Sequence, residues 1–123
     1  MGPENDDAPI LLIGNGPSAE ADLAKLDLTR YRNRCAVNYF AATEWFAVVR
    51  PEFYFLQDDY WFQDDDNMLR QKAKQTFSSL NSKVSWGLTL VVPARFYQQF
   101  RDSGRISNRC ITLQAMSAAS LRE

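Results

Sequence analysis

The segment Ile10–Ser18 has the sequence Ile-Leu-Leu-Ile-Gly-Asn-Gly-Pro-Ser, and it decides the fold. Its apolar part, Ile10–Ile13, is a continuous run, which is typical of a strand buried on both faces of a parallel sheet. Gly14–Ser18 then forms a tight turn, and Ser18 is a good N-cap for a following helix. The segment therefore predicts a strand, a glycine turn and a helix in direct succession.

The alternation of strand and helix continues along the chain. Further strands are predicted over residues 35–37, 53–56, 84–92 and 110–113, and helices over residues 18–26, 43–49, 65–80 and 93–102. This order indicates a parallel sheet joined by right-handed crossovers. We therefore expect an α/β fold, a Rossmann-like three-layer sandwich in which helices cover both faces of a parallel sheet of about five strands.

The length of 123 residues suits one domain. Residues 1–9 are expected to form a flexible lead-in, and residues 10–123 a single domain, either complete or a fragment of a longer enzyme. The acidic, polar start is unlike a signal peptide, and no apolar run is long enough for a transmembrane helix, so we expect a cytoplasmic protein. Cys35 and Cys110 each lie in an apolar run and are interpreted as reduced core residues.

Charge and composition exclude several functions. The net charge of −1 argues against a nucleic-acid binder, because neutralising phosphates needs a basic surface. The chain contains no histidine, which excludes histidine-dependent triads and histidine zinc sites within these residues.

Polar residues follow the first three predicted strands. They are Gly14–Ser18 after the first strand, Asn38 and Tyr39 after the second, and Gln57–Trp61 after the third. Ligands of open parallel sheets bind at the carboxyl ends of the strands, at the point where the strand order reverses. We therefore expect these three sets of residues to meet in one crevice.

The glycine turn is predicted to bind an anion such as phosphate. Gly14 and Gly16 allow a close approach of the backbone, and the free N–H groups of the next helix point at the turn. Asn15 and Ser18 can donate further hydrogen bonds. The alternative is a turn that needs glycine for its geometry alone. A dinucleotide site is disfavoured, because it needs an acidic residue about 20 positions on, where this chain has Asn38.

Other side chains are weaker candidates. Tyr39 and Tyr60 are possible walls of the pocket, although aromatic residues are usually packed in the core. Arg34, Arg50 and Arg95 are able to pair with phosphate, but we expect surface charges, because none follows a predicted strand end.

Three segments carry a resemblance to a known family. Ile13–Ser18, Arg34–Phe40 and Arg50–Asp58 resemble the nucleotide-binding half of bacterial sialyltransferases that use CMP-sialic acid. They are also similar to related proteins of surface-polysaccharide synthesis and, more distantly, to archaeal-type hydroxymethylpterin pyrophosphokinases. The resemblance spans roughly residues 10–62 and implies that Asn15 and Ser18 contact the donor phosphate and that Asn38 contacts the nucleotide.

Two departures from that family matter. Asp58 stands near a position where the sialyltransferases have asparagine, which favours a Mg²⁺-assisted relative or a different donor. The catalytic histidine of the family lies in a later segment and has no counterpart here. No catalytic residue is assigned, and no cofactor is required unless Asp58 holds Mg²⁺.

The sequence thus predicts a nucleotide-sugar-binding domain of a sialyltransferase-like glycosyltransferase for cell-surface glycan synthesis. The alternatives are a non-catalytic nucleotide-binding or regulatory module and a Mg²⁺-dependent phosphoryl transferase. The predicted partner is a nucleotide or nucleotide-sugar. The predicted binding residues are Gly14, Asn15, Gly16, Pro17, Ser18, Asn38, Tyr39 and Asp58.

Overall fold

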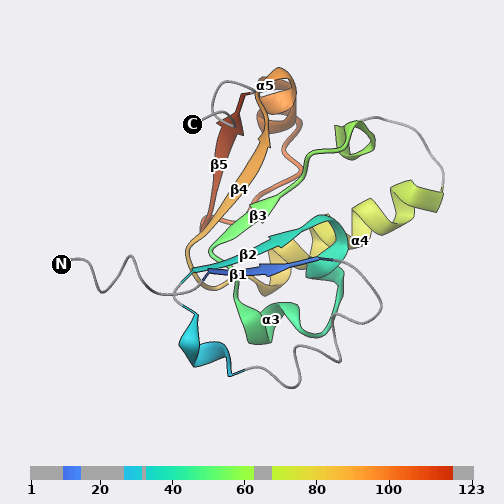
Figure 1. The fold of residues 1–123 in the computed structure, drawn as a ribbon. Coiled ribbons are helices and arrows are strands. Elements are labelled where there is room, and N and C mark those ends of the chain that lie inside the picture. The colour runs from blue at the N-terminus through green and yellow to red at the C-terminus, as the bar shows by residue number, and fades with distance from the viewer. Residues whose placement is uncertain (1–9, 15–26, 32, 63–67, 118–123) are drawn as a thin grey trace.

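The computed structural model describes residues 10–14, 27–31, 33–62 and 68–117 and contains one parallel sheet of five strands (Figure 1). The strands are β1 (Ile10–Ile13), β2 (Asn33–Val37), β3 (Phe53–Phe55), β4 (Leu88–Pro93) and β5 (Ile111–Met116). The α/β, Rossmann-like fold class predicted from the sequence is therefore confirmed. The expected lead-in over residues 1–9 and the expected helix over residues 18–26 lie outside the described residues.

Helical segments connect the strands. The α-helices are α3 (Phe46–Val49), α4 (Met68–Lys83) and α5 (Ala94–Ser103), and short 3-10 turns cover η1 (Leu28–Arg30), η2 (Asn38–Ala42) and η3 (Asp59–Phe62). Gly104 ends α5 in the left-handed conformation with φ 71°, which glycine adopts without steric cost. The helix predicted over residues 43–49 is shorter than expected, because residues 43–45 form a bend and turn and the α-helix begins at Phe46.

The strands follow one another across the sheet in the order β1-β2-β3-β4-β5. The order never changes direction among these strands. The predicted crevice was expected at a point where the strand order reverses, and the five strands contain no such point. Right-handed crossovers that always step in the same direction leave their helices on the same face. The expectation of helices on both faces is accordingly not met by α3, α4 and α5.

The core lies between that face and the helices. Ile13, Ala36, Tyr54 and Leu90 stand in register across four strands and point to this face. Buried side chains of all three α-helices join the same cluster, namely Phe46 and Val49 of α3, Ala73, Phe77 and Leu80 of α4, and Phe100 of α5. On α4, Ala73, Thr76, Phe77 and Leu80 are buried at helical spacing, whereas Lys72 is exposed.

The opposite face of the sheet, here called the open face, carries apolar side chains as well. Leu12, Cys35 and Phe53 stand in register on it, and Leu12 is 70% and Phe53 36% exposed. Ile10, on the same face of β1, is 64% exposed. The prediction that Ile10–Ile13 is buried on both faces is therefore wrong, because β1 is an edge strand and α3, α4 and α5 all lie on the other side.

The Tyr54 hydroxyl fixes the chain where β2 ends. It donates a hydrogen bond to the carbonyl oxygen of Asn38 and accepts one from the N–H of Ala41 at 2.7 Å. Tyr54 and Ala41 are fully buried, so water does not satisfy these groups instead. A side chain of β3 thus holds the turn η2 that follows β2.

We predict that Tyr54→Phe lowers the free energy of unfolding by about 1–3 kcal/mol, because it removes the hydroxyl that satisfies the buried N–H of Ala41 and the part-buried carbonyl of Asn38. Urea denaturation followed by circular dichroism measures this loss. Tyr97→Phe removes a hydroxyl from a half-buried position on α5 and serves as the control. Equal stabilities of the two variants would contradict the assigned role of Tyr54.

Candidate functional site

The carboxyl ends of β1, β2 and β3 border a cavity of about 280 Å³, here called the β1–β3 hollow. Leu12, Val37 and Phe55 line it from the open face of the sheet and make an apolar floor. Polar side chains complete the lining where β2 and β3 end, namely Asn38, Gln57 and Asp58. Of the three sets of residues expected to meet in one crevice, the second contributes Asn38 and the third contributes Gln57 and Asp58 to this hollow.

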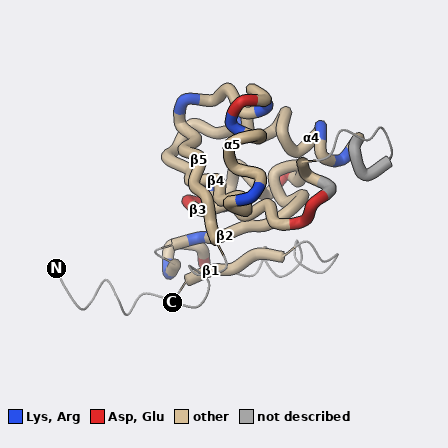
Figure 2. Tube along the Cα trace, turned by 90° about the horizontal axis from the view of Figure 1, so that it is seen from above, with Lys and Arg blue, Asp and Glu red and all other residues tan. Residues whose placement is uncertain are grey.

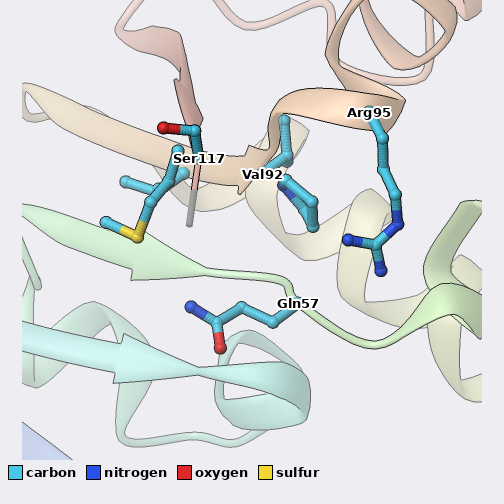
Figure 3. Close-up of a pocket in the computed structure, with 7 residues that line it drawn as sticks. Gln57, Val92, Arg95 and Ser117 are labelled. Atoms are coloured by element: carbon cyan, nitrogen blue, oxygen red, sulfur yellow. The ribbon is translucent and has the colours of Figure 1, made fainter. Parts of the chain in front are cut away.

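A second cavity of about 220 Å³, the β4–β5 hollow, lies beside the ends of β4 and β5. It is lined by Gln57, Val91, Val92, Pro93, Arg95, Met116 and Ser117. Figure 3 shows Gln57 extending from the segment after β3, across from Ser117 and Val92, while Arg95 projects from the start of α5.

Gln57 lines both hollows. Its position follows from Leu56, which is fully buried and donates its N–H to the carbonyl oxygen of Val91 at 3.1 Å. This bond extends the pairing of β3 with β4 beyond Phe55. Each hollow alone is smaller than the roughly 300–1,000 Å³ typical of small-molecule sites. A ligand of that size would therefore extend out of either hollow.

Asn38 has a left-handed backbone, with φ 55°. Asparagine adopts this conformation more readily than most residues other than glycine. The Tyr54 hydroxyl accounts for its persistence, because it binds the Asn38 carbonyl oxygen. Strained backbone of this kind gathers at functional sites, and here it lies at the rim of the β1–β3 hollow.

Gly14 directly follows β1, and it is exposed. No described atom lies within 4 Å of the position that a Cβ atom would occupy. Crowding by the described residues therefore does not explain glycine at this position, and a substitution there can test the predicted phosphate contact. Asn15, Gly16, Pro17 and Ser18, the other predicted members of the loop, lie outside the described residues.

Arg95 is a site residue that the sequence analysis missed. It begins α5 directly after β4 and lines the β4–β5 hollow, whereas we expected it away from any strand end. Its Nη2 atom lies 2.7 Å from Oδ1 of Asp59. The signal was present in the sequence, because Pro93, Ala94 and Arg95 follow a predicted strand as the first three sets do.

The other two arginines have structural contacts. Arg34, expected to be a surface charge, donates from Nη1 to the Val49 carbonyl and from Nη2 to the Leu28 carbonyl, both at 2.7 Å. It therefore ties the start of β2 to the end of α3. Arg50 is exposed and lies over the ring of Trp86, with its Cζ atom 5.2 Å from the ring centroid.

Tyr39 lines neither hollow. Its ring contacts Trp61, with 4.9 Å between the ring centroids, and Nζ of Lys72 lies 5.7 Å from the centroid of Tyr39. Its predicted role as a pocket wall stays a prediction. The side chain of Tyr60 is outside the described part of the molecule.

Charged residues are spread over the described chain, and neither sign forms a continuous band (Figure 2). Among the residues that the structure describes, no three histidine, cysteine, aspartate or glutamate side chains group as metal ligands. The helices within this part of the chain are too short or too polar to cross a membrane.

In comparisons with known proteins, no family model matches the chain, and no curated protein or solved structure is significantly similar to it.

The two cysteines differ in environment, and both thiols are free. Cys35 is half-buried in β2, and burial raises the pKa of its thiol, with a smaller contribution from the Glu52 carboxylate. Cys110 is exposed just before β5, so its predicted place in the core is wrong. The thiolate is the reactive form of cysteine.

We predict that iodoacetamide modifies Cys110 before Cys35 at pH 7.5, because Cys110 is exposed, whereas Cys35 is half-buried and the raised pKa of its thiol lowers its thiolate fraction. The rate at Cys35 should continue to increase as the pH rises past the ordinary thiol pKa. Peptide mass spectrometry over a pH series measures both rates. The Cys110→Ser variant isolates the slow thiol, and equal rates at every pH would contradict the prediction.

Proposed function

We propose that this chain is a nucleotide-sugar-binding domain of the sialyltransferase-like glycosyltransferase type, serving cell-surface glycan synthesis. The observation that carries the proposal is the β1–β3 hollow, in which an apolar floor meets Asn38, Gln57 and Asp58 at the ends of adjacent strands. A nucleoside has matching chemistry, because its base is largely apolar on its faces and its sugar and base edges form hydrogen bonds.

The sequence resemblance supports the same ligand. It assigns nucleotide contact to Asn38, and Asn38 lines the hollow with its backbone fixed by Tyr54. Gly14 opens the predicted phosphate loop and directly follows the neighbouring strand β1, and no described atom lies within 4 Å of the position of its absent Cβ atom. A nucleotide with its base and ribose in the hollow would direct its phosphate toward this end of β1.

The role proposed for the chain is binding. Its residues include no histidine to take the part of the family's catalytic histidine. Holding a leaving phosphate and orienting the nucleotide are contributions that a binding domain makes to transfer chemistry. A turnover assay with donor nucleotides distinguishes the two roles, because a binding domain shows no turnover and an enzyme does.

We predict that CMP binds saturably in isothermal titration calorimetry and that Asn38→Gly weakens binding by about tenfold, as expected for the loss of about one hydrogen bond. Glycine accepts the left-handed backbone, so stability should change by less than about 1 kcal/mol. Gln75→Ala, which removes an exposed amide on α4, is the control and should bind CMP normally.

Gly14→Ala provides an independent check of the phosphate contact. It should leave the melting temperature unchanged, because no described atom crowds the site, and it should weaken CMP more than cytidine. The absence of heat with millimolar CMP, in protein shown to be folded by circular dichroism, would overturn the proposed function.

A further inference from the structure

Two adjacent carboxylates at the end of β3 have different environments. Asp59 is paired with Arg95, with 2.7 Å between Oδ1 and Nη2, so its charge is balanced within the protein. Asp58 lines the β1–β3 hollow, and within the described part of the chain its carboxylate forms no ion pair. The Asp58 carbonyl oxygen accepts the N–H of Trp61 at 3.2 Å, and Trp61 is fully buried, so the backbone of Asp58 is anchored to the core.

Among the described residues that line the β1–β3 hollow, Asp58 is the one with a charged side chain, and it is acidic. Leu12, Val37 and Phe55 are apolar, and Asn38 and Gln57 are neutral amides. A phosphate placed against Asp58 would meet like charge without a described lysine or arginine in the lining to offset it. The part of a nucleotide that contacts Asp58 is therefore a neutral part that donates hydrogen bonds.

A ribose supplies such a group in its vicinal 2′ and 3′ hydroxyls. An ionised carboxylate has two oxygen atoms that only accept hydrogen bonds, so it can take one from each hydroxyl. Hydrogen bonds to an ionised acceptor are about twice as strong as those between neutral groups. The neutral amides of Asn38 and Gln57, which can donate and accept, complete the rim beside it.

We propose that Asp58 binds the 2′ and 3′ hydroxyls of a ribose, and that the site thereby selects ribonucleotides over 2′-deoxyribonucleotides. This inference rests on the proposed nucleotide site and adds the sugar class of its ligand. It also sets the orientation of the ligand, with the base over Leu12, Val37 and Phe55 and the phosphate directed away from Asp58.

The test compares calorimetric affinities for CMP and 2′-deoxy-CMP. UMP, AMP and GMP and their 2′-deoxy forms are measured as well, in case the site prefers a base other than cytosine. The wild-type protein should bind the ribonucleotide at least about tenfold more tightly, the factor expected from the loss of one charge-assisted hydrogen bond. Asp58→Asn should reduce that ratio to about two or less. Asp59→Asn changes the neighbouring carboxylate, which is already paired, and should keep the wild-type ratio.

The outcomes separate this inference from the function on which it rests. If folded protein binds no nucleotide of the panel, the proposed function is wrong and the ribose assignment with it. If ribo and deoxy forms bind equally well, nucleotide binding stands and the ribose assignment is overturned. If CMP affinity requires millimolar Mg²⁺ and Asp58→Asn removes that requirement without changing the ribo-to-deoxy ratio, Asp58 is a metal ligand instead.

Discussion

The uninterrupted strand order β1-β2-β3-β4-β5 is the constraint on which the other features depend. Because every right-handed crossover steps in the same direction, the described helices collect on one face, and the large aromatic and aliphatic residues of the core follow them there. The open face keeps Leu12, Val37 and Phe55 available at the carboxyl ends of the strands. The apolar floor of the candidate site is thus a direct result of the topology.

The polar rim depends on the core in turn. Tyr54 points to the helix-covered face with its ring buried, while its hydroxyl holds the Asn38 backbone in the left-handed conformation. Asp58 is anchored in the same way through the N–H of the buried Trp61. Packing on the far side of the sheet therefore positions the backbones of two residues of the rim.

Much of this structure follows from sequence pattern. All five strands were predictable as apolar runs between polar turns, and the left-handed glycine after α5 was predictable as a helix stop. The boundaries of β4 were misjudged, because Val84 is buried in the connection from α4 and not in a strand. The length of β5 was underestimated, because Gln114 and Ala115 are exposed on an edge strand and lack an apolar signal. Strand order depends on pairing between distant segments, so the covering of only one face of the sheet by α3, α4 and α5 could not be predicted from local sequence.

The parallel direction of all strands has a practical consequence for handling the protein. The Cys110 thiol precedes β5, at the amino ends of the strands, and the two hollows lie at the carboxyl ends. A fluorophore or a biotin linker coupled to Cys110 would therefore stand at the opposite edge of the sheet from Asn38 and Asp58. Immobilisation through that atom would present the cavities to the flowing solution in a surface-based sensor.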